Sequence, residues 1–125
     1  MNPSLKSAEL KKQLFKLYND VNKEIYASGV IELKISFVDD MIIFITKHNR
    51  VPALVVLEER FFQLKQSVDQ ALFDEFKLRF KNRFMEKFHI EPSSMLRDYD
   101  GTSQIAVTVI VLSEKNFELF LNNDG

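Results

Sequence analysis

The sequence predicts an α+β fold with the order helix, hairpin, long helix, hairpin, short helix. Three observations lead to this fold class: two long segments carry apolar residues at helical spacing, four short segments are alternating or continuous apolar runs, and turn residues join these short segments in pairs. Such elements form a mainly antiparallel four-stranded sheet with helices packed on one face. Because 125 residues is a common size for one hydrophobic core, residues 1–125 are expected to form a single domain.

The first helix is expected over residues 4–27. Its apolar residues recur at spacings of three and four and therefore share one face, while lysines and other polar residues occupy the rest of the surface. Gly29 is the predicted stop, because glycine adopts the left-handed conformation that ends a helix. The apolar positions are Leu10, Leu14, Leu17, Val21 and Ile25.

The first hairpin is predicted from a change of period. Residues 31–37 alternate between apolar and polar side chains, which is typical of a half-buried strand. Asp39 and Asp40 then form a short polar turn. Residues 41–46 are an apolar run without alternation, so this second strand is expected to be covered on both faces or central in the sheet.

The middle of the chain is predicted to be mostly one helix. Residues 47–50 form a loop, and Pro52 suits the first turn of a helix because that position needs no amide donor. Residues 53–57 leave two alternatives open, a short strand or the first turns of the helix, since two adjacent valines lower helix propensity. From Glu58 to His89 no glycine or proline interrupts the helix, which would span about 45 Å.

Four phenylalanines at a strict spacing of four follow in this long helix. Each step of four residues advances about 40° around the helix, so this Phe ladder rotates along it. One interpretation is that the protein's own core covers the ladder, with the first helix as a candidate cover. The other is self-association, in which a second copy buries the ladder and the protein is a homodimer. The Phe ladder is Phe76, Phe80, Phe84 and Phe88.

The second hairpin and a short helix complete the fold. Residues 95–99 form a weak strand, and Asp100 with Gly101 is a strong hairpin signal. Residues 105–112 are mostly β-branched and apolar on both faces, so this strand is expected in the sheet interior. Ser113 can cap a final helix that ends at Leu121, and residues 122–125 are a tail.

The residue types give little support for catalysis. The chain has no cysteine and only three glycines, so neither a thiolate site nor a glycine-rich phosphate loop can be built. The two histidines, His48 and His89, lack metal-ligand spacing, and Asp39 with Asp40 is explained by its turn. We therefore predict no catalytic residue, no cofactor-binding residue and no metal ligand, and we expect the protein not to be an enzyme.

The net charge of −1 excludes a generally basic nucleic-acid binder. Along the long helix, however, the acidic and basic side chains are unevenly distributed. Acids lie in its first part and cations in its last part, in the direction that the helix dipole favours. The cations are interpreted either as a solvated face or as a contact surface for an acidic partner protein or an anionic membrane. They are Lys77, Arg79, Lys81, Arg83 and Lys87.

The sequence also predicts a cytoplasmic location. No apolar run approaches the roughly 18–20 residues of a membrane span. Residues 1–12 are polar and charged, unlike a signal peptide, and the absence of cysteine favours a reducing compartment.

Several of these segments together resemble the MpsC-like family of small bacterial proteins. The segments are the strands around Asp39-Asp40-Met41, the loop to Pro52-Ala53, the long charged helix that ends near His89, and the hairpin at Asp100-Gly101. The resemblance covers roughly residues 8–112. It implies a non-enzymatic accessory or regulatory subunit of a membrane ion or bicarbonate transport system. Peripheral membrane contact is a separate option that depends on the cations of the long helix. No catalytic residue is carried over.

The chain departs from that family at the start of the long helix. Val51 stands where serine or threonine would cap a helix better, and residues 53–57 are more apolar than the charged start that the family suggests. This segment is therefore either an extra strand or an apolar contact surface.

The alternative function for the whole protein is a small-molecule or anion-sensing regulatory domain that holds its ligand between the sheet and the helices.

Overall fold

The computed structural model describes residues 3–27, 29–47 and 52–122, and the predicted α+β class and element order are confirmed. The predicted loop at 48–50, with His48, and the capping position Val51 lie outside the described residues, as do 123–125 of the predicted tail. The elements are α1 (Pro3–Tyr26), β1 (Glu32–Val38), β2 (Met41–Lys47), α2 (Pro52–Arg60), α3 (Phe62–Phe88), β3 (Ser94–Asp100), β4 (Ile105–Val111) and α4 (Glu114–Leu121).

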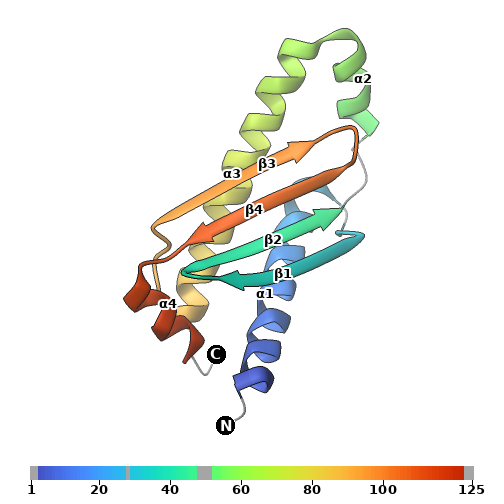
Figure 1. The fold of residues 1–125 in the computed structure, drawn as a ribbon. Coiled ribbons are helices and arrows are strands. Elements are labelled where there is room, and N and C mark those ends of the chain that lie inside the picture. The colour runs from blue at the N-terminus through green and yellow to red at the C-terminus, as the bar shows by residue number, and fades with distance from the viewer. Residues whose placement is uncertain (1–2, 28, 48–51, 123–125) are drawn as a thin grey trace.

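The four strands form one sheet in the order β1-β2-β4-β3, and every neighbouring pair is antiparallel. The interior position predicted for residues 105–112 is confirmed, because β4 pairs with both β2 and β3. Figure 1 shows α1, α3 and α4 on one side of this sheet. None of the helices in the described parts of the chain has the length and apolar character that crossing a membrane requires.

The core lies between the sheet and these helices. Alternate residues of β2 and β4 point toward the helices and are completely or almost completely buried, as the period of two in a strand requires. Tyr18 from α1 fills the centre, where its ring stacks on Phe44 at 5.1 Å, and its hydroxyl lies 3.5 Å from the Thr108 hydroxyl. The inward residues of the two central strands are Ile42, Phe44, Thr46, Ala106, Thr108 and Ile110.

The Phe ladder is part of this core, which corrects the interpretation as a self-association surface. Its four side chains are between 0% and 1% exposed. Phe76 and Phe80 pack on Tyr18 at 4.9 and 6.0 Å between ring centres, while Phe84 and Phe88 pack on Phe120 of α4 at 5.9 and 5.1 Å. Because the ladder rotates along α3, its first two residues face α1 and its last two face α4. The interpretation that the protein's own core covers the ladder is confirmed.

The predicted uninterrupted helix from Glu58 to His89 is wrong at Phe61. This residue has φ −137° and ψ 60°, which separates α2 from α3, and α2 folds back beside the start of α3 beyond the end of the sheet (Figure 1). If α2 continued straight into α3, the apolar residues of α2 would lie away from the rest of the protein. The turn at Phe61 lets Leu54 and Val55 approach α3 instead. Residues 53–57 are helical, so the strand alternative is excluded.

The first helix ends earlier than Gly29. Ala27 takes the left-handed conformation, with φ 61°, and its amide donates to the Lys23 carbonyl at 2.9 Å. Gly29 serves a different purpose: a Cβ there would lie 2.9 Å from the Asn19 side-chain oxygen, which accepts a hydrogen bond from the Val30 amide. The absence of a side chain at position 29 lets this connection pass close to α1.

The second face of the sheet is uncovered in the described part of the chain. Of the two alternatives for residues 41–46, the central position in the sheet is confirmed for β2, and cover on both faces is not. Figure 1 shows no helix in front of this face. Five of its apolar side chains are between 37% and 62% exposed, and four more are half-buried. We call this surface the open face; its apolar residues are Val38, Met41, Ile43, Ile45, Leu96, Ile105, Val107, Val109 and Val111.

Ser113 caps α4 as predicted, and its loss gives a testable effect. The Ser113 hydroxyl accepts a hydrogen bond from the Asn116 amide at 3.1 Å. Ser113→Ala is expected to lower the free energy of unfolding by about 1 kcal/mol, because the first turn of the helix loses an acceptor. Urea denaturation measures this effect, with Ser103→Ala in the exposed β3–β4 turn as the control. Equal stabilities of the two variants would contradict the role of the cap.

Candidate functional site

The five cations proposed as a contact surface lie in two groups on α3. The helical geometry of α3 places Lys77 and Lys81 on one side of the Phe ladder, and Arg79, Arg83 and Lys87 on the other. The ladder between them is buried in the core, so on that side of the helix the two groups are separated.

Three of these cations are paired within the chain. Arg79 contacts Glu75 at 2.8 Å on the same helix. Arg83 binds Glu24 of α1 at 2.5 Å, and Lys81 binds Glu91 at 3.3 Å. These pairs are partly exposed and support the interpretation of a solvated face, where each pair is worth about 0–1 kcal/mol. Contact of any of the five with a partner or an anionic membrane stays a prediction.

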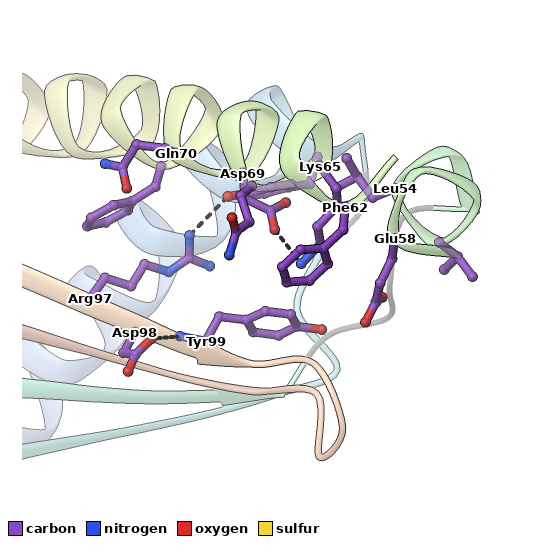
Figure 2. A pocket seen from close by; sticks show the side chains of 13 residues that line it. Leu54, Glu58, Phe62, Lys65, Asp69, Gln70, Arg97, Asp98 and Tyr99 are labelled. Atoms are coloured by element: carbon purple, nitrogen blue, oxygen red, sulfur yellow. Dashed lines mark hydrogen bonds and ion pairs between the residues drawn. The ribbon is translucent and has the colours of Figure 1, made fainter. Parts of the chain in front are cut away.

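A cavity whose lining residues the sequence did not predict lies between the α2–α3 turn and β3. Its volume is about 500 Å³. Figure 2 shows α3 along one side, β3 along the other, and α2 at the far end. The apolar part of the wall comes from the helices, through Leu54, Val55, Phe62 and Phe73, and the turn at Phe61 brings the first three of these residues together.

Arg97 is a polar residue that β3 directs toward the helices at this cavity. It lies on β3 and points toward the helices, where its guanidinium donates to the Tyr26 hydroxyl at 2.9 Å. Its terminal carbon also lies 5.6 Å from the ring centres of Tyr26 and Phe73, and 5.1 Å from that of Phe76. Three rings therefore surround the cation and hold it in one place through cation–π attraction.

The surroundings of Arg97 keep it charged. Burial lowers the pKa of Arg97, but the hydroxyl groups of Tyr18 and Tyr26 raise it by more, so the net direction is upward. A pKa raised in the folded state contributes stability below the pKa of the unfolded chain and loses it only in strongly alkaline solution. Across the physiological range the cavity therefore presents a fixed positive charge.

The opposite wall carries ionic and amide groups from α3. Lys65 forms an ion pair with Asp69 at 2.5 Å, one helical turn away. Gln70 donates from its side-chain amide to Asp74 at 2.9 Å, and Gln66 also lines the cavity. Glu58 of α2 adds a further carboxylate. The cavity thus combines an apolar wall with cations, carboxylates and amides, an arrangement suited to a ligand that is itself both polar and apolar.

The sequence contains one signal that could have located this cavity. Met95, Arg97 and Tyr99 share one face of the predicted strand because side chains alternate in a strand. Met95 is buried in the core, so the arginine on the same face had to point inward as well. A charged residue on the inward face of a strand marks a candidate polar site, but the three rings around it come from α1 and α3, which no local pattern connects to β3.

No candidate metal site is found among the described residues. Within residues 3–27, 29–47 and 52–122, no group of three or more His, Asp or Glu side chains is placed to hold a metal ion. His89 ends α3 in the left-handed conformation, with its amide donating to the Met85 carbonyl at 2.9 Å. Asp39 also has positive φ, 54°, and the predicted turn at Asp39 and Asp40 is confirmed.

Comparison of the chain with models of protein families, with curated proteins and with solved structures gives no match. The resemblance to the MpsC-like family accordingly stays a prediction.

Proposed function

We propose that this protein is a non-enzymatic regulatory domain of the cytoplasm that binds a small organic acid in the cavity beside Arg97. The observation that carries the proposal is the placement of a fixed cation, held by three aromatic rings, in the wall of a cavity of about 500 Å³. Ligand pockets commonly have volumes of about 300–1,000 Å³ and combine apolar walls with a few oriented polar groups.

The charges around the cavity narrow the class of ligand. Arg97 and Lys65 attract an anionic group, and a guanidinium suits a carboxylate because two N–H groups can bind its two oxygens. Glu58 and Asp69 lie on the same lining and disfavour a polyanion. Leu54 and Phe62 provide contacts for an apolar body. A monoanionic or zwitterionic acid with an apolar part therefore fits better than a nucleotide or inorganic phosphate.

A thermal-shift screen tests this function. A ligand that binds only the folded state raises the melting temperature, by an amount equivalent to about 2.7 kcal/mol at a hundred times its dissociation constant. We expect shifts with probes such as phenylalanine or octanoate, and smaller ones with ATP, phosphate or bicarbonate. A screen in which hydrophobic acids give no shift would contradict the proposal.

Two exposed apolar residues of α3 provide a matched pair of variants. Phe62 lines the cavity and is 56% exposed, whereas Leu78 is 55% exposed and lies outside it. Phe62→Ala is expected to weaken binding of a responding acid about tenfold, through the loss of apolar contact area, while Leu78→Ala leaves it unchanged. Titration calorimetry measures both affinities. Equal affinities would place the binding elsewhere on the molecule.

The association with a membrane transport system remains a second proposal, supported by the resemblance to the MpsC-like family alone. An accessory subunit of such a system and a ligand-binding regulator are compatible, because the cavity occupies only the region between α2, α3 and β3 and leaves other surfaces for a partner. Co-purification with a transporter from native membranes would support this association, and recovery of the protein without any membrane component would count against it.

A further inference from the structure

The open face has an apolar centre and a charged rim. Its apolar residues are concentrated on the two central strands, β2 and β4, and the edge strands carry most of the charges. Isolated exposed apolar residues are ordinary, but a contiguous set on one sheet face marks an interaction site. Both central strands are apolar on their two faces, a composition typical of strands that are covered on both sides.

The register of the sheet arranges these residues in rows that cross all four strands. One row begins with Lys34 on β1, continues through Ile45 and Val107, and ends with Asp98 on β3. The two charges stand about 14 Å apart, three strand spacings, so they cannot pair within one chain. The Asp98 carboxylate accepts a hydrogen bond from the Tyr99 amide at 2.9 Å, which holds it at the edge of the sheet.

We propose that the open face is the interface of a homodimer in which the sheets of two copies pack face to face. A twofold axis between the sheets and parallel to the strands exchanges the β1 edge of one copy with the β3 edge of the other. This operation places Lys34 over Asp98 of the second copy and, by symmetry, Asp98 over its Lys34. Ile45 then lies over Val107, so apolar residues meet apolar residues at the centre.

Two of the three remaining rows fit the same operation. In these two rows, Ile43 lies over Val109 and Met41 over Val111, which buries the middle of both open faces. The last row places Glu32 over Asp100 at the rim, a like-charge contact that Lys47, beside Glu32 in the same row, offsets only in part. Packed sheets cross at about 30°, which displaces the edges by about 4 Å, a distance that a lysine side chain can span.

The size of the open face limits the surface area that the dimer can bury. Four strands of seven residues cover about 19 by 24 Å, or about 450 Å² per copy. Stable interfaces bury about 800 Å² per partner, so the dimer is expected to be weak, with a dissociation constant in the micromolar range. This surface differs from the Phe ladder, which the core of each copy already uses.

A charge exchange tests the arrangement. Sedimentation velocity from about 10 to about 500 μM covers the expected dissociation constant. Lys34→Glu and Asp98→Lys each turn two attractive contacts into repulsive ones, so each is expected to weaken the dimer about tenfold or more. The double variant recreates both pairs with the signs exchanged and is expected to return to within about threefold of the wild type.

Two further variants separate this interface from other modes of association. Val109→Glu puts a charge at the centre of the open face and is expected to abolish the dimer, while circular dichroism reports whether the monomer stays folded. Lys12→Glu, on the exposed side of α1, is the charge control and is expected to leave the dimer unchanged. A monomer over the whole concentration range, or a dimer indifferent to both single reversals, overturns the proposal.

Discussion

Replacement of Phe80 by alanine is expected to lower the free energy of unfolding by about 3–5 kcal/mol. Phe80 is completely buried, and its ring contacts Tyr18, Phe44, Phe76 and Phe84 at 5.6 to 6.3 Å between ring centres. Truncation leaves a cavity at the point where α1, α3 and β2 meet, and four rings lose a packing partner. Such a loss is a large share of the total stability of a small domain, which is about 5–15 kcal/mol.

Urea denaturation followed by circular dichroism measures the effect of Phe80→Ala. Phe15→Ala is the matched control, because Phe15 is 43% exposed on α1 and its loss is expected to cost less than about 1 kcal/mol. If the alanine variant at position 80 fails to fold, Phe80→Leu keeps most of the volume and is expected to cost about 1–2 kcal/mol. A stability equal to that of the Phe15 control would contradict the position of the ladder in the core.

Arg97→Met is the second large expected effect, a loss of about 2–3 kcal/mol of stability. Methionine retains an apolar stem of similar length but loses the cation–π attraction to three rings and the hydrogen bond to Tyr26. A desolvated cation–π contact is worth up to about 2 kcal/mol, and a hydrogen bond from a charged donor about 1.5–3 kcal/mol, partly offset by relief from burying the charge. The protein should remain folded, so ligand binding can be measured on the same variant.

Chemical denaturation of three variants distinguishes the contribution of the Arg97 charge from that of the planar shape of its guanidinium. The variants are Arg97→Met, Arg97→Lys and Arg79→Met. Lysine keeps the charge but cannot stack its head group flat on a ring, so Arg97→Lys is expected to recover less than half of the loss. Arg79 forms a partly exposed pair with Glu75, and its replacement is expected to cost less than about 1 kcal/mol. If Arg97→Met were no less stable than Arg79→Met, the aromatic surroundings of Arg97 would have no structural role.

Local patterns in the sequence were sufficient for most elements of the fold. The alternation in residues 31–37, the apolar run in 41–46 and the turn signal at Asp100-Gly101 each depend on neighbours in the chain, and each lies in the predicted type of element. The break at Phe61 was missed because its cause is tertiary: backbone propensity favours a continuous helix, whereas the contacts of α2 require the chain to turn.

The candidate site was harder to predict than the fold. The spacing of the Phe ladder was visible, but which partner covers it depends on the packing of α1 and α4, which no local pattern specifies. The cavity at Arg97 requires β3, α1 and both halves of the broken helix to come together. That the opposite charges of the open face stand at the two ends of one row follows only from the strand order and register.

The strand order has a kinetic consequence. Each hairpin forms from contacts close in sequence, but the pairing of β2 with β4 joins Met41 to Val111 and closes a loop that contains α2 and α3. Closing a loop of this length costs conformational entropy, and the contacts that offset this cost form only after the loop has closed. This pairing is therefore expected late in folding. Until then the two apolar strands have unpaired edges, and a newly made chain is expected to depend on rapid folding to avoid aggregation through them.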